Sequence, residues 1–102
     1  MVQILTRLAT LLEYPQRRYV ENAITALRRR DHDAAQQVLN SVEFWGGPGS
    51  VWDVRSVDSE TNRCLDLSLA ELLDEMKRLS IVSEPVWNRR ATLPAKGKST
   101  PS

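Results

Sequence analysis

Six apolar side chains between residues 65 and 79 recur at the spacing of an α-helix. Counted from the first of them, the others follow at offsets of four, seven, eight, eleven and fourteen residues. Because an α-helix turns once in about 3.6 residues, these side chains share one face, which must be buried against other helices. The stripe consists of Leu65, Leu69, Leu72, Leu73, Met76 and Leu79.

Two helix-start signals, one before this stripe and one within it, predict different structures for the residues that lead into the helix. Asp58-Ser59-Glu60 predicts a long helix, because a short carboxylate can accept hydrogen bonds from the first amides of a helix. Ser68 with Glu71 is a capping-box pattern, which predicts a shorter helix preceded by a strand over 63–67. We expect the longer helix, and the shorter one remains the alternative.

The first thirty residues predict two more helices. Apolar residues of 2–13 recur on one helical side, and Tyr14-Pro15 ends this helix because proline disfavours the helical conformation of the residue before it. A second helix is expected over 15–30. The side chains expected to face inward are Ile4, Leu5, Leu8, Leu11, Leu12, Val20, Ala23, Ile24 and Leu27.

A short helix over 32–40 is expected to follow, with Asp31 or Asp33 as its N-cap. Its inward side chains would be small, which lets it pack closely against the second helix as an antiparallel hairpin. They are Ala34, Ala35, Val38 and Leu39.

The segment 42–50 contains three of the four glycines and two aromatic side chains, a composition that takes the backbone out of regular structure. The valine-rich segment 51–57 then predicts a short strand, with a helical turn capped by Ser50 as the alternative. A lone strand needs a neighbour, so we expect 81–87 or a second molecule to pair with it.

Together these segments predict a mainly α fold. The expected architecture is a small four-helix domain over residues 1–91, with a glycine- and tryptophan-rich loop and one or two short strands if the pairing occurs. Residues 92–102 are rich in Pro, Lys, Ser and Thr and are expected to form a disordered polar tail.

The chain lacks the sequence signals of a secreted or membrane protein. No run approaches the roughly 20 apolar residues needed to cross a bilayer, and the first residues lack a signal-peptide pattern. A single cysteine, Cys64, cannot form an internal disulfide, which agrees with a cytoplasmic protein and favours a buried structural thiol.

The charges are segregated along the chain although the net charge is only +1. Residues 1–30 carry +4, residues 31–80 carry −6 and residues 81–102 carry +3. The acidic section predicts a face that attracts a basic partner, and the alternating blocks favour a homo-oligomer. The carboxylates of this predicted acidic face are Asp53, Asp58, Glu60, Asp66, Glu71, Asp74 and Glu75.

Basic side chains concentrate in the second helix and at its end. Arginine neutralises phosphate groups, so this arginine patch predicts nucleic-acid binding as an alternative function. Four nearby carboxylates, Glu13, Glu21, Asp31 and Asp33, dilute it. The arginine patch consists of Arg17, Arg18, Arg28, Arg29 and Arg30.

The run from Phe44 to Asp53, here named the Gly/Trp loop, resembles a loop of small, uncharacterised bacterial helical proteins. In those proteins a helical hairpin is followed by an aromatic residue, Gly-Gly-x-Gly-Ser, a hydrophobic or aromatic pair and Asp or Asn, and then a closing helix. The resemblance covers about residues 5 to 80 and implies a compact helical fold, with no reaction or ligand. Pro48 and Trp52 depart from the commoner residues of that loop.

The Gly/Trp loop is also the candidate binding site. Its glycines would let successive amides turn toward one point beside two tryptophans, which supply a large, rigid contact area for a partner protein. The alternative is that both tryptophans fill the core and the glycines only permit a tight crossover. The candidate partner-binding residues are Phe44, Trp45, Gly46, Gly47, Gly49, Ser50, Trp52 and Asp53.

No residue pattern indicates catalysis. His32 lies between Asp31 and Asp33, but adjacent helical positions diverge by about 100°, so the three cannot converge on a metal ion. We therefore expect no enzyme activity, no cofactor and no metal. The leading expectation is a protein-binding accessory domain, either toxin-neutralising (immunity-like) or regulatory, and nucleic-acid binding is the alternative.

Overall fold

The computed structural model describes residues 1–93, and within this range every regular element is helical. The small domain is therefore mainly α, as the apolar periodicities predict. Its α-helices are α1 (Val2–Thr10), α2 (Gln16–Arg28), α3 (His32–Leu39), α4 (Val42–Trp45), α5 (Ser59–Arg78) and α6 (Glu84–Trp87), and its 3₁₀ helices are η1 (Val51–Asp53) and η2 (Asn88–Thr92).

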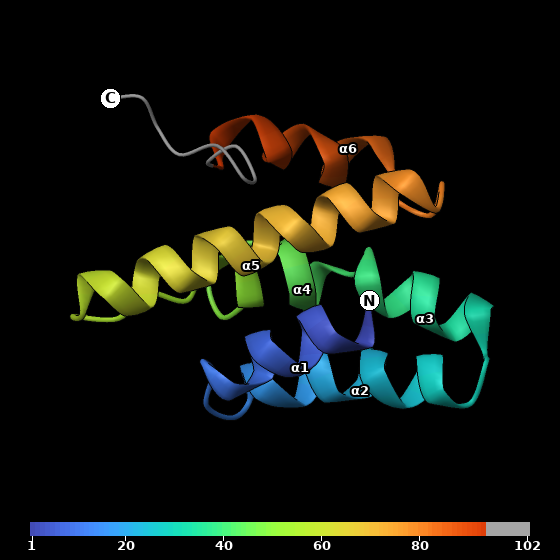
Figure 1. The fold of residues 1–102 in the computed structure, drawn as a ribbon, viewed down its shortest axis with the longest axis horizontal. Coiled ribbons are helices and arrows are strands. Elements are labelled where there is room, and N and C mark those ends of the chain that lie inside the picture. Colours follow the sequence, from blue (N-terminus) through green and yellow to red (C-terminus); the bar gives the residue numbers. More distant parts are fainter. Residues whose placement is uncertain (94–102) are drawn as a thin grey trace.

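The longest helix, α5, runs through the middle of the molecule. Figure 1 shows α1, α2 and α3 on one side of α5 and the red segment of α6 and η2 on the other. Helix α1 packs against both α2 and α5, and α2 also packs against α3, which returns beside it as the expected hairpin. The short α4 and η1 pack against α2 and against each other, and α4 also packs against α3. The buried Phe44, Trp45 and Val51 hold this part of the Gly/Trp loop against the core.

The core forms where the apolar faces of these helices meet. Most of the α5 stripe is fully buried, which confirms the predicted face. Helix α1 contributes Leu5, Leu8 and Ala9 to the core, and Leu12 follows just after it. Leu79 is the exception: it is the C-cap of α5, one residue beyond the helix, and is 45% exposed. Packing of this kind supplies most of the stability of short helices.

Two N-caps are the ones that the sequence indicates. Asp31 accepts a hydrogen bond from the amide of Ala34 at the start of α3. Asp58 accepts from the hydroxyl of Thr61 and the amide of Glu60, and these bonds lower the pKa of the Asp58 carboxyl below its ordinary value. Helix α5 therefore begins at the earlier of its two predicted starts, and the alternative strand over 63–67 is wrong.

Two helices end in a left-handed residue that is not glycine. Arg30, after α2, and Ser80, after α5, both have φ of +59°. In each case the next amide bonds back to a carbonyl of the last turn, from Asp31 to Ala26 and from Ile81 to Met76. This is the Schellman pattern, in which the positive φ lets the chain reverse direction.

The predicted strand over 51–57 is wrong. Val51–Asp53 is the 3₁₀ helix η1, so the alternative helical turn is correct, although the Ser50 side chain donates to the Gly46 carbonyl instead of capping it. The expected strand partner, 81–87, contains α6. Val51 is buried in the core, and this burial holds a turn where a valine-rich segment favours a strand.

The helical segment extends slightly beyond residue 91. Thr92 ends η2, and Leu93 packs against the core, with its carbonyl accepting a hydrogen bond from Arg90. The rest of the expected tail, 94–102, lies outside the described residues.

Candidate functional site

The first half of the Gly/Trp loop belongs to the core. Phe44 and Trp45 form the short helix α4 and are 0% and 2% exposed. The indole Nε1 of Trp45 donates to the carbonyl of Leu39 at 2.6 Å, so the buried N–H is satisfied where α3 ends. Both side chains therefore fill the core, as the alternative interpretation has it, and partner binding by them stays a prediction.

The second half of the loop is open to solvent. Gly47 and Gly49 are exposed, Trp52 is half-buried and Asp53 is exposed, whereas Ser50 is buried. The side chain of Gln16, at the start of α2, donates to the carbonyl of Gly49 at 3.0 Å. The loop is thus tied to α2, and five of its eight candidate residues are exposed or half-buried: Gly46, Gly47, Gly49, Trp52 and Asp53.

The three glycines of the loop serve different purposes. A Cβ on Gly46 would lie 2.5 Å from the backbone oxygen of Val42, so only glycine fits there. Gly49 has φ of +86°, a conformation that favours glycine. Gly47 has an ordinary φ and open space around its Cα, so the fold places no requirement for glycine at this position.

The half-exposed Trp52 lies between two neighbours. Its ring centroid is 5.7 Å from that of Trp45, and the guanidinium of Arg89 on η2 lies 5.1 Å from the Trp52 ring. The second tryptophan therefore bridges the core and the surface, and a cation already lies against its ring.

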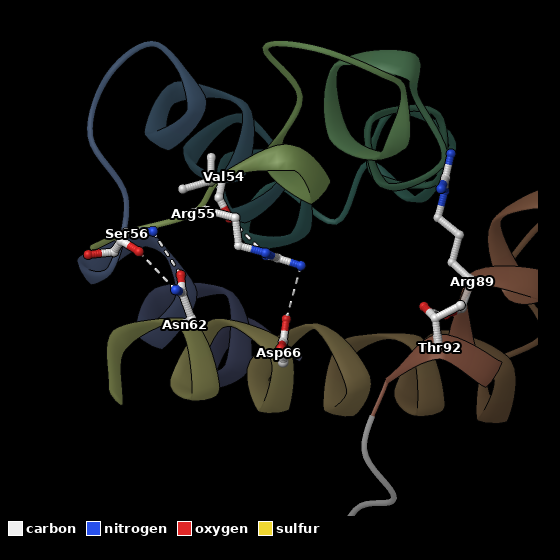
Figure 2. Close-up of polar contacts among 7 residues, drawn as sticks. All are labelled: Val54, Arg55, Ser56, Asn62, Asp66, Arg89 and Thr92. Atoms are coloured by element: carbon white, nitrogen blue, oxygen red, sulfur yellow. Dashed lines mark hydrogen bonds and ion pairs between the residues drawn. The ribbon is translucent and has the colours of Figure 1, made fainter. Parts of the chain in front are cut away.

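The predicted acidic face is neutralised from within the molecule. Figure 2 shows Arg55, in the connection after η1, reaching Asp66 on α5, and Asn62 bonded to the backbone of Ser56 beside it. Similar pairs join α5 to α1 and to η2, and others form within α5. The ion pairs are Arg7–Glu71, Arg55–Asp66, Arg63–Glu60, Arg78–Glu75 and Arg90–Asp74.

Because of these pairs, little of the acidic face is free to attract a basic partner. Two of its seven carboxylates lie outside ion pairs within residues 1–93, Asp53 and the N-cap Asp58. Of the two reasons for expecting self-association, the unpaired strand is absent from residues 1–93, and many charges of the alternating blocks pair with one another within this range. The homo-oligomer itself stays a prediction.

The arginine patch differs from the acidic face. Arg18, Arg28, Arg29 and Arg30 are exposed, and no ion pair within residues 1–93 involves any of them. Only Arg17 is paired, with Glu21 at 3.3 Å. The uncompensated cations of the described chain thus concentrate on α2 and its C-terminal turn.

The four carboxylates near the arginine patch in the sequence reduce its positive charge less in the folded structure. Glu21 is held by Arg17 and by the hydroxyl of Tyr14, and the Asp31 side chain caps α3. Asp33 lines a groove with Val82 and Ser83, on the side of α3 that faces the α5–α6 connection. Glu13 remains exposed near the start of α2.

Tyr14 is a surface feature that the sequence reasoning missed. It is 57% exposed, and the guanidinium groups of Arg17 and Arg18 lie 5.9 and 5.8 Å from its ring centroid. The order Tyr-Pro-x-Arg-Arg carries the signal, because it places two arginines in the helical turn after the ring. The same residues also indicate a helix break, and a reader who stops at the helix break overlooks the surface feature.

Residues 1–93 lack two further kinds of feature. No group of three or more His, Cys, Asp or Glu side chains in this range is placed to hold a metal ion. No helix in this range has the length and apolar character to cross a membrane. Cys64 is half-buried at the α1–α5 groove.

No protein-family model, curated protein or solved structure matches the chain. The functional interpretation therefore depends on the geometry described above.

Proposed function

We propose that this protein is a small, non-enzymatic domain that binds the phosphate backbone of nucleic acid through the arginine patch. The observation that carries the proposal is the contrast in pairing: the carboxylates of α5 are matched by arginines, whereas four arginines of the patch have no ion pair within residues 1–93. Exposed, unpaired arginines on α2 and its C-terminal turn provide the charge that phosphate contacts require.

The helix geometry suits this role. Arg17 and Arg28 lie eleven residues apart, about three helical turns, so they share a side of α2. Arg18 and Arg29, the C-cap residue of α2, are related in the same way. At a rise of about 1.5 Å per residue, the two arginines of each pair are separated by about 16 Å along the helix axis. One face of α2 can thus contact phosphates at two places on the same nucleic acid.

Fluorescence anisotropy with labelled oligonucleotides tests the proposal. The double variant Arg28→Gln/Arg29→Gln is expected to weaken binding and to reduce the slope of log K against log salt by about one unit for each phosphate that the variant no longer neutralises. Arg63→Gln is the matched control, because Arg63 is an exposed arginine on α5, away from the patch. No binding by the folded wild type at low salt, or an equal loss of affinity in the control, would contradict the proposal.

A second candidate is protein binding through the open half of the Gly/Trp loop, in a toxin-neutralising or regulatory role. It is favoured by Gly47, which is glycine at an exposed position where the fold does not need one, beside the half-exposed Trp52. A partner backbone that approaches closely would explain this residue. If this candidate is correct, crosslinking from Asp53 should capture one partner protein, and Gly47→Val should abolish the capture. Val42→Thr, at another exposed position, is the control. Equal crosslinking by Gly47→Val and Val42→Thr would reject this candidate.

A further inference from the structure

We infer that Tyr14, with Arg17 and Arg18, forms a stacking site for an unpaired base, so that the preferred ligand is single-stranded nucleic acid. This inference rests on the proposed function and specifies its substrate class. It uses a different surface feature, an exposed aromatic ring at one end of the arginine patch.

Tyr14 stands out among the aromatic side chains of the described chain. Phe44 and Trp45 are buried, and Tyr19, Trp52 and Trp87 are partly buried against the core, whereas Tyr14 is 57% exposed and lies outside the core cluster. Core packing therefore does not account for the ring.

The ring is nevertheless held in place. Its hydroxyl lies 3.0 and 3.1 Å from the two carboxylate oxygens of Glu21, and Glu21 in turn pairs with Arg17. Both neighbouring guanidinium groups lie close to the ring centroid, at 5.9 and 5.8 Å. An aromatic side chain that is both oriented and exposed loses little conformational entropy when a flat ligand stacks on it.

A single strand matches this arrangement better than a duplex does. Bases of a single strand expose their flat faces and stack on tyrosine rings and guanidinium planes, while bases of a duplex are already stacked on one another. Phosphates on either side of a stacked base would lie near Arg18, and the strand could continue along α2 toward Arg28 and Arg29. The exposed Glu13 beside the ring is the carboxylate that opposes this path.

The test compares Tyr14→Leu with Tyr14→Phe in anisotropy titrations against oligothymidine and against a duplex of equal length. Phe keeps the ring and loses the hydroxyl bond to Glu21, whereas Leu removes the ring at similar polarity. For the single strand, Tyr14→Leu is expected to weaken binding about 5- to 100-fold, and Tyr14→Phe within about twofold of wild type. For the duplex, both variants should bind as wild type does. Circular dichroism confirms that each variant is folded.

The outcomes separate the two proposals. Equal single-strand affinity of Tyr14→Leu and wild type overturns the stacking site, and the proposed function stands if Arg28→Gln/Arg29→Gln still weakens binding. An equal loss of affinity for both ligands in Tyr14→Leu also overturns it, because the ring would then act through the fold or through the arginines. If wild type binds neither ligand at low salt, both proposals are wrong.

Discussion

Trp45 and Trp52 are the same residue type, seven positions apart in one loop, yet they have different environments. Trp45 is enclosed because its indole N–H finds the carbonyl of Leu39 at the open end of α3, which removes the cost of burying that donor. Trp52 stays half-exposed and is stacked by Arg89. The difference between the two tryptophans is thus that the indole N–H of Trp45 has a hydrogen-bond partner inside the core.

The glycines of the Gly/Trp loop allow a prediction at this residue scale. Gly46→Ala is expected to destabilise the fold by about 2 kcal/mol or more, because its Cβ would collide with the Val42 backbone. Gly49→Ala should cost about 1–2 kcal/mol through its positive φ. Gly47→Ala should be neutral or stabilising by up to about 1 kcal/mol. Urea denaturation of the three variants measures these differences.

The ranking of the three variants by stability tests this explanation of the glycines. A Gly47→Ala variant as unstable as Gly46→Ala would mean that the fold does require glycine at residue 47. The second candidate function would then lose its supporting observation.

At the scale of single elements, the helices begin where the sequence indicates and end through backbone geometry. Asp31 and Asp58 are N-caps of the expected type, whereas the ends of α2 and α5 use Arg30 and Ser80 in the left-handed conformation. Glycine favours this conformation most, so its absence left the two helix ends without a clear sequence signal. The predicted helix over 15–30 is accordingly longer than α2.

This geometry predicts that Ser80→Gly stabilises the protein. Ser80 occupies a conformation that is unfavourable for a residue with a side chain, and glycine relieves that cost while adding some freedom to the unfolded state. Ser80→Gly should exceed Ser80→Ala in stability by about 1 kcal/mol, measured by denaturation midpoints at an unchanged m value. If Ser80→Ala is as stable as Ser80→Gly, the left-handed conformation of residue 80 does not lower the stability of the protein.

At the scale of the whole molecule, one polar side chain joins segments far apart in the sequence. The amide of Asn40, at the C-cap of α3, donates to the carbonyl of Ile81 at 2.8 Å and accepts from the amide of Ser83 at 2.8 Å. It thereby fixes the connection between α5 and α6 against α3. Nothing in the sequence around Asn40 predicts this role, because its partners are more than forty residues away.

We expect Asn40→Ala to destabilise the protein by about 1–3 kcal/mol, because two long-range hydrogen bonds are removed and a backbone carbonyl is left without its partner. Gln37→Ala is a suitable control, since Gln37 is an exposed side chain of the same helix. Thermal unfolding of both variants gives the comparison, and hydrogen exchange of the Ser83 amide should rise in Asn40→Ala alone. Equal stability of the two variants would show that the Asn40 side chain contributes nothing to stability.

The apolar spacing along this chain was enough to predict the mainly α fold, the buried face of α5 and the hairpin of α2 and α3, because helical periodicity and N-caps are local properties. Tertiary packing decided the rest. It turned the valine-rich segment after Ser50 into a 3₁₀ helix by burying Val51, and it separated the two tryptophans of the loop. It also matched acidic residues of α5 with arginines from other segments and left four of the five arginines of the patch without an ion pair within residues 1–93. These outcomes depend on which side chains meet across the fold, and a linear charge pattern does not contain that information.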